Sequence, residues 1–246
     1  MGSPSKIREE KLKEDTEVLR RDLADLVSEL EAFPIRDIPL PTRGSPWGIP
    51  DKLLIYKQAS LLRSRLLLKG VACEVDRGNV PASLACLRAF VEEVASYTFL
   101  LSELRERLDG KATLDEVSEF LNRISTGRKT RPRPGVTPKP FHINDMLRSA
   151  DRLFETLLPE LSGVLWDTYT FVSDLVHPNS PARYQFWKLK GDHAVFVEKG
   201  DLLRDDLWMI LNYTAMAGKL YLIVIGRLDD LITDLEDSSS SSPLVR

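Results

Sequence analysis

The chain has 246 residues, of which 43% are hydrophobic, so it is long enough to bury a sizeable core. Its formal net charge of -3 argues against a surface that coats nucleic acid as a whole, although a local basic segment is compatible with this balance. The longest apolar run, residues 220–225, is too short to span a bilayer and the N-terminus lacks the apolar core of a signal peptide, so we expect a cytoplasmic protein without a membrane role.

The first fifty residues are expected to form an appended arm. Between residues 6 and 32, apolar side chains recur at helical spacing among dense charges, which predicts an amphipathic helix that must pack on something. Residues 33–50 contain five prolines and two glycines, which exclude regular structure. We therefore divide residues 1–50 into an N-terminal amphipathic helix and a proline-rich connector.

Residues 51–237 are expected to form an all-α helical bundle. Helical apolar spacing covers residues 51–69, 81–104, 143–158, 161–177 and 201–236. Thr113 followed by Glu116 is a capping box, which predicts a further helix over residues 113–125. Alternation over residues 184–198 around Gly191-Asp192 predicts a small β-hairpin between the last two helices. The serine-rich residues 238–246 are expected to be a disordered tail.

The cysteines and histidines lack a metal-binding pattern. Cys73 and Cys86 lie in or near apolar segments without CxxC spacing, which favours reduced, buried thiols over a disulfide or a zinc site. His142, His177 and His193 have no HExxH spacing. We therefore expect neither a metal nor a cofactor.

A basic loop lies between two of the predicted helices. Residues 127–140 carry five lysines and arginines and no acidic residue. Arg128, Lys129 and Arg131 are candidates for binding phosphate, and a solvated basic linker is the equally open alternative.

The most informative segment is residues 169–180. Tyr169, Ser173 and His177 are spaced four apart, so they share one face of a helix, and Pro178-Asn179 should end that helix at His177. Such a row of polar groups can exchange protons. The structural alternative is that His177 interacts with the carbonyl end of its own helix.

Arg88 and Glu92 are a second candidate pair. They are four residues apart in a segment that otherwise looks buried. One interpretation is a solvated ion pair. The other is a partly buried pair that faces the His177 helix, in which the arginine holds a phosphate and the carboxylate orients the imidazole.

Together with Gly127-Arg128 and Asn144, these segments resemble a group of bacterial helical proteins related to the HEPN superfamily, over about residues 50–236. The resemblance implies a HEPN-like helical bundle that forms a homodimer. It also implies a role in bacterial defence or stress response, such as antiviral or toxin–antitoxin systems. HEPN proteins include metal-independent ribonucleases, which bind and cleave RNA, and non-catalytic binding modules.

The nuclease signature of that superfamily places an arginine before the histidine, with a spacer of four to six residues between them. Here those places hold Thr170, Phe171 and Val172, so Arg88 or Arg128 is expected to supply the charge. In a ribonuclease, His177 would be the base or acid and the arginine would stabilise the transition state. The resemblance then assigns catalytic or positioning roles to His177, Arg88, Glu92 and Tyr169, and RNA or phosphate binding to Arg128, Lys129, Arg131, Asn179 and Ser173.

Two other functions remain open from the sequence. In a non-catalytic interaction module, the helix of residues 6–32 and the long closing helix would contact a protein partner, and His177 would only tie down a helix end. A binder of a nucleotide or another phosphorylated small molecule would use the same basic residues. Salt-sensitive binding of RNA but not of mononucleotides would separate RNA from this last ligand class.

Overall fold

The structure, a computed structural model, describes residues 4–38, 48–110, 112–126, 139–177, 187–196 and 204–241. Four of the predicted ligand-binding residues lie outside these ranges: Arg128, Lys129 and Arg131 of the basic loop, and Asn179.

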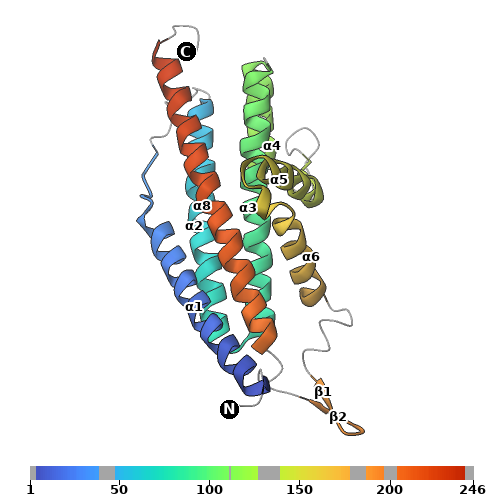
Figure 1. The fold of residues 1–246 in the computed structure, drawn as a ribbon. Helices are drawn as coiled ribbons and strands as arrows, with labels where there is room; N and C mark the ends of the chain where they lie inside the picture. The colour runs from blue at the N-terminus through green and yellow to red at the C-terminus, as the bar shows by residue number, and fades with distance from the viewer. Residues whose placement is uncertain are drawn as a thin grey trace. The chain divides into compact units, whose positions relative to one another are not determined.

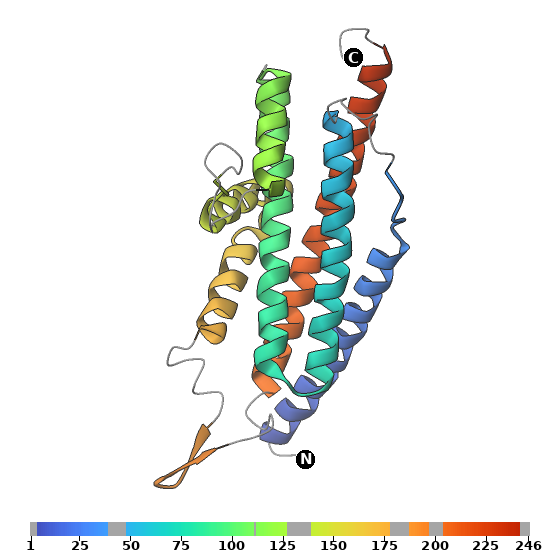
Figure 2. The ribbon, with the colours of Figure 1, turned by 180° about the vertical axis from the view of Figure 1, so that it is seen from behind.

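The described chain is mostly helical, which confirms the all-α class (Figure 1; Figure 2 from behind). A short antiparallel pair of strands precedes the last helix, with Gly191 at a positive φ of 65° in the turn between them. The elements are α1 (Pro4–Ala32), α2 (Ile49–Asp76), α3 (Val80–Asp109), α4 (Leu114–Thr126), α5 (Ile143–Leu157), the 3-10 helix η1 (Pro159–Leu161), α6 (Val164–Val176), β1 (Trp187–Lys190), β2 (His193–Phe196) and α8 (Arg204–Ser241).

The helices divide into two compact units, each made of three separate stretches of chain. The first unit consists of Met1–Phe33, Ser64–Glu92 and Gly163–Lys219. The second consists of Pro34–Arg63, Glu93–Ser162 and Leu220–Arg246.

In the first unit, the apolar stripe of α1 packs on the protein's own helices. Leu23, Leu26 and Leu30 are buried. Gly218 of α8 allows the closest approach, because a Cβ atom at that position would lie 1.9 Å from Cδ2 of Leu26. Ion pairs flank the stripe: Arg20 with Asp76 and Lys69 with Glu31 join α1 to α2, and Lys219 with Asp22 joins it to α8. These three leucines are therefore not exposed to an outside partner.

In the same unit, one arginine of α2 binds the C-terminal end of α1. Arg65 donates from Nε to the carbonyl of Leu30 at 2.7 Å and from Nη2 to the carbonyl of Phe33. The last carbonyls of a helix have no partner within the helix and carry its negative dipole end. The half-buried Arg65 side chain supplies both the donors and the positive charge.

The second unit contains a polar cluster inside its core. Ser60 and the hydroxyl of Tyr221 are 2.9 Å apart, and the Tyr97 ring packs edge-on to the Tyr221 ring. Glu93 is buried and pairs with Arg63. Desolvation raises the pKa of Glu93, and its bonds to Ser60 and Arg63 oppose that shift.

The predicted capping box begins α4 in this unit. The Glu116 carboxylate accepts from the Thr113 backbone N–H at 2.8 Å, and the Thr113 hydroxyl accepts from the Glu116 N–H at 3.3 Å. The bonds that the backbone N–H and the hydroxyl of Thr113 donate to the Glu116 carboxylate lower its pKa. Three rings, Phe99, Phe120 and Phe141, then meet within about 6 Å of one another and join α4 and the segment before α5 to α3.

Several sequence-based boundaries were wrong. Helix α2 runs to Asp76 rather than ending near residue 69, because Gly70 lies where α2 contacts Cys86 of α3 and so does not act as a stop. Helix α8 continues to Ser241, so the first residues of the expected disordered tail are helical, since extending an existing helix is far easier than starting one. Helix α6 starts at Val164, after Gly163 with φ of 77°, instead of at residue 161.

The prediction that both cysteines are buried also needs correction. Cys73 is exposed rather than buried, because it lies on the face of α2 opposite Leu68, Val71 and Val75, whereas Cys86 is partly buried; both are free thiols.

The stretch Leu207–Glu236 of α8 is long and apolar enough to cross a membrane, by length and mean hydropathy alone, although 56% of its most apolar window is buried within the protein. Scattered polar residues divide this stretch into shorter apolar runs, so counting only unbroken apolar runs in the sequence does not reveal its length.

Gly218 and Gly226, both in α8, offer a matched test of the close helix contact. Nothing lies within 4 Å of a Cβ atom at Gly226, so Gly226→Ala should raise the free energy of unfolding by about 1 kcal/mol through helix propensity alone. Gly218→Ala should instead lower it by about 1–2 kcal/mol, because Leu26 must move. Urea unfolding measures both, and equal stabilisation by the two alanines would contradict the contact.

Arg65→Ala should lower the free energy of unfolding by about 1.5–3 kcal/mol, because it leaves helix-end carbonyls without their charged donor. Arg65→Lys should recover only part, since an ammonium cannot reproduce the fork. Arg77 is the control: its side chain is exposed and pairs with Glu74, three residues before it, so Arg77→Ala should change stability by less than about 0.5 kcal/mol. If Arg65→Ala and Arg77→Ala lowered the free energy of unfolding by similar amounts, the hydrogen bonds of Arg65 to the end of α1 would not be stabilising as proposed.

Glu93 and Glu116 should show opposite pH dependence in unfolding experiments between acid and neutral pH. The raised pKa of Glu93 means that its stabilising contribution is present at low pH and is lost as the pH rises through the folded-state value, so wild type should weaken relative to Glu93→Gln. The lowered pKa of Glu116 gives stability that is present above its usual value of 4.5, so wild type should strengthen relative to Glu116→Gln. If the two stability differences changed in the same direction with pH, the opposite pKa shifts of Glu93 and Glu116 would be contradicted.

Candidate functional site

The candidate site begins where α6 ends. Pro178 follows His177 in the sequence, and a residue before proline is restricted to extended conformations. His177 accordingly has φ of -70° and ψ of 145°, and its backbone N–H donates to the carbonyl of Ser173 at 3.0 Å. The imidazole therefore stands exposed at the C-terminal end of the helix.

Arg88 of α3 contacts this helix end with its guanidinium. Its Nη1 lies 3.2 Å from Nε2 of His177, and its Nη2 donates to the Tyr169 hydroxyl at 3.3 Å. The guanidinium carbon also lies 5.5 Å from the centre of the Tyr169 ring, a cation–π distance. All these residues belong to the first unit. This is the arrangement expected if the Arg88–Glu92 pair faces the His177 helix.

Glu92 acts on the arginine. Its carboxylate accepts from Nε of Arg88 at 3.3 Å, one helical turn along α3. The Arg88 side chain is 23% exposed and that of Glu92 is 37% exposed, so the pair is neither fully solvated nor sealed. Glu92 thus orients the guanidinium, whereas the sequence-based expectation had it orient the imidazole.

The contact between Arg88 and His177 fixes the roles of the ring nitrogens. Arginine has donors only, so Nη1 donates and Nε2 of His177 accepts. A neutral imidazole that accepts at Nε2 carries its proton on Nδ1. The resting arrangement therefore has a lone pair on Nε2 that points at a cation.

Ser173 is not part of this group. Its hydroxyl oxygen is sealed from solvent and has no hydrogen-bond partner among the residues that the structure describes. Arg88, Glu92, Tyr169 and His177 come together, whereas the Ser173 hydroxyl makes no hydrogen bond to them. The contributions of Arg128, Lys129, Arg131 and Asn179 stay predictions.

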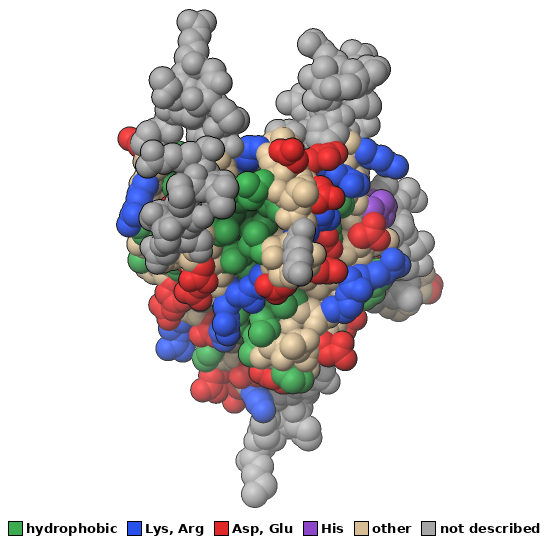
Figure 3. All heavy atoms as spheres, turned by 90° about the horizontal axis from the view of Figure 1, so that it is seen from above, with side chains coloured by type: hydrophobic (Ala, Val, Ile, Leu, Met, Phe, Trp, Pro, Cys, Tyr) green, Lys and Arg blue, Asp and Glu red, His purple; other side chains and the backbone are tan. Residues whose placement is uncertain are grey.

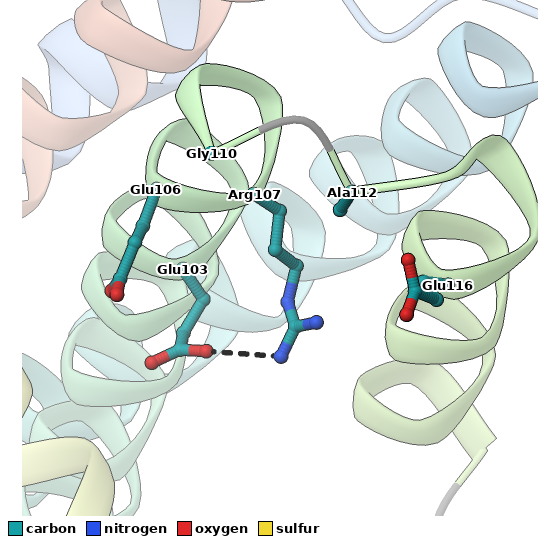
Figure 4. Close-up of a pocket in the computed structure, with 6 residues that line it drawn as sticks. All are labelled: Glu103, Glu106, Arg107, Gly110, Ala112 and Glu116. Carbon is teal, nitrogen blue, oxygen red and sulfur yellow. Dashed lines mark hydrogen bonds and ion pairs between the residues drawn. The ribbon is translucent and has the colours of Figure 1, made fainter.

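A separate hollow of about 420 Å³ lies in the second unit and was not foreseen from the sequence. Figure 4 shows Arg107 of α3 extending between Glu103 and Glu116. Arg107 donates to Glu103 at 3.3 Å and lies over the Phe120 ring, and Glu116 is occupied by the capping box. The Glu103-x-x-x-Arg107 spacing was the available signal. Nε of Arg107 is buried without a hydrogen-bond partner among the described residues, but Glu103 and Glu116 are both paired, so the hollow is a weaker candidate than the group around Arg88.

Neither the surface drawn in Figure 3 nor the metal-ligating side chains of the described residues indicate a further candidate site. On the face drawn in Figure 3, acidic and basic side chains are interspersed rather than separated by sign. Across the residues described, no three His, Cys, Asp or Glu side chains form a group that could hold a metal ion.

Comparison with known proteins yields no relative: no family model, no curated protein and no solved structure matches the chain. Any function is therefore inferred from the geometry around Arg88 and from the resemblance of its motifs.

Proposed function

We propose that this is a HEPN-like protein of bacterial defence or stress response, located in the cytoplasm, that binds RNA as a homodimer and cleaves it without a metal. One observation carries the proposal: an arginine and a histidine from separate helices lie within hydrogen-bonding distance, 3.2 Å, at an exposed helix end. A cation and a proton acceptor side by side are the two groups that phosphodiester cleavage by the ribose 2′-hydroxyl requires.

In the proposed reaction, His177 takes the proton of the 2′-hydroxyl through Nε2. The 2′-oxygen forms a bond to phosphorus, and the bond from phosphorus to the 5′-oxygen breaks. The leaving 5′-oxygen receives a proton from water, which gives a 2′,3′-cyclic phosphate and a 5′-hydroxyl end. Arg88 stabilises the extra negative charge on the phosphate oxygens in the transition state.

Arg88 takes the place of the arginine in the superfamily's signature. Of the three signature positions, Val172 is fully buried and the ring of Phe171 packs on Tyr213, so neither would present a guanidinium to solvent. An arginine from α3 brings the same charge to the histidine from a different helix. Tyr169 and Glu92 hold that guanidinium in position.

Cleavage of a single-stranded RNA in the presence of EDTA tests the proposal. His177→Ala should reduce the rate by at least about 100-fold, because the proton acceptor is lost. Arg88→Ala should reduce it by about 100- to 1000-fold, because the transition-state charge is no longer stabilised. The 2′,3′-cyclic end group, detected by mass spectrometry, identifies the reaction.

Matched controls exist for both substitutions. His193 is exposed on β2 and Arg77 lies on the surface at the end of α2, so His193→Ala and Arg77→Ala should leave the rate unchanged. Circular dichroism should show full helix content in every variant. An unchanged rate for His177→Ala, or no cleavage by wild type of any RNA that it binds, would overturn the catalytic proposal and favour a non-catalytic interaction module.

A further inference from the structure

The contact that defines the candidate site also blocks it. Nη1 of Arg88 donates to Nε2 of His177 at 3.2 Å, so the lone pair that would take a proton is already occupied. In this arrangement the imidazole cannot accept a hydrogen from a ribose hydroxyl. Arg88 is thus both the cation of the site and the group that keeps its histidine inactive.

The guanidinium of Arg88 can also bind a phosphate group. The guanidinium has five N–H donors, and the described contacts use Nε for Glu92, Nη1 for His177 and Nη2 for Tyr169. Phosphate oxygens form charge-assisted hydrogen bonds with arginine that are about twice as strong as neutral ones, and they match its fork. The Tyr169 hydroxyl accepts from Nη2, so its own hydrogen can still be donated.

We infer that Arg88 is a phosphate-released latch on His177: a phosphate group that binds the guanidinium takes the Nη1 donor and frees Nε2 of the imidazole. The ligand class is a phosphate group, whether free, in a nucleotide or in an RNA chain. The relevance of the latch to catalysis rests on the proposed function, but the exchange of partners at Arg88 does not.

Glu92 opposes the release of the latch. Its carboxylate holds Nε of the same guanidinium, and its negative charge repels an incoming phosphate. Replacing it by glutamine keeps an acceptor oxygen for Nε but removes the charge. Glu92→Gln should therefore bind inorganic phosphate about fivefold more tightly, which is the change expected for the loss of about 1 kcal/mol of repulsion between partly exposed charges.

The full chain with nitrogen-15-labelled histidine allows a direct test, because it has three histidines. Two-bond proton–nitrogen spectra report which ring nitrogen carries the proton. His142 is an internal control, since its Nδ1 accepts from the Asn144 backbone N–H at 3.2 Å and so it holds the opposite tautomer. Adding inorganic phosphate should shift the Nε2 signal of His177 and leave His142 in place.

Substitution of the arginine completes the test. In Arg88→Ala and Arg88→Gln, the His177 signal should already stand at the released position and should not respond to phosphate. Wild-type His177 that does not respond while phosphate binds to the protein would overturn the latch, as would a full response in both Arg88 variants. A looser rather than tighter phosphate affinity in Glu92→Gln would also contradict it.

Three ligands distinguish the sources of phosphate: inorganic phosphate, an adenosine monophosphate and an RNA whose 2′-hydroxyls are methylated so that it cannot be cleaved. A response to RNA at far lower concentration than to the other two assigns the latch to RNA, and equal responses assign it to a small phosphorylated ligand. A response without cleavage of ordinary RNA would reject the proposed ribonuclease and keep the latch. Cleavage without any response would reject the latch alone.

Discussion

The guanidinium of Arg88 is the constraint on which the candidate site depends. Helix α6 has 13 residues and ends at a histidine that the following proline holds in an extended conformation. Arg88 joins α6 to α3 at two points, His177 and Tyr169, which lie on one face of the helix about two turns apart. The planar guanidinium of Arg88, which Glu92 orients, therefore sets the position of the His177 imidazole.

Two neighbouring glutamates on α3 have different surroundings because successive residues of a helix point in different directions. Glu92 is partly exposed and orients Arg88, whereas Glu93 points into a buried polar cluster, pairs with Arg63 and has a raised pKa. About 100° of helix rotation separates the two side chains. One carboxylate therefore adjusts a solvent-facing cation, and the other places a titratable group in the core.

The sequence predicted those features that depend on local rules. The end of α6 at His177 follows from Pro178, the start of α4 follows from the Thr113–Glu116 capping box, and the approach of Arg88 to His177 was one of two stated alternatives. Features that depend on tertiary packing were not predictable. The clamp of Arg65 on α1 and the contact of Leu26 with Gly218 join residues that are distant in the chain, and the exposure of Cys73 depends on which face of α2 the core selects.

The three-part make-up of each compact unit limits how the protein can be dissected. Three of the five boundaries between the units, at residues 63/64, 92/93 and 219/220, lie inside α2, α3 and α8. No single truncation can excise one unit, because any cut that removes the other must sever three continuous helices. Deletion mapping, the usual route to a minimal active fragment, would destroy both halves together, so the residues that matter must be found by point substitution in the intact chain.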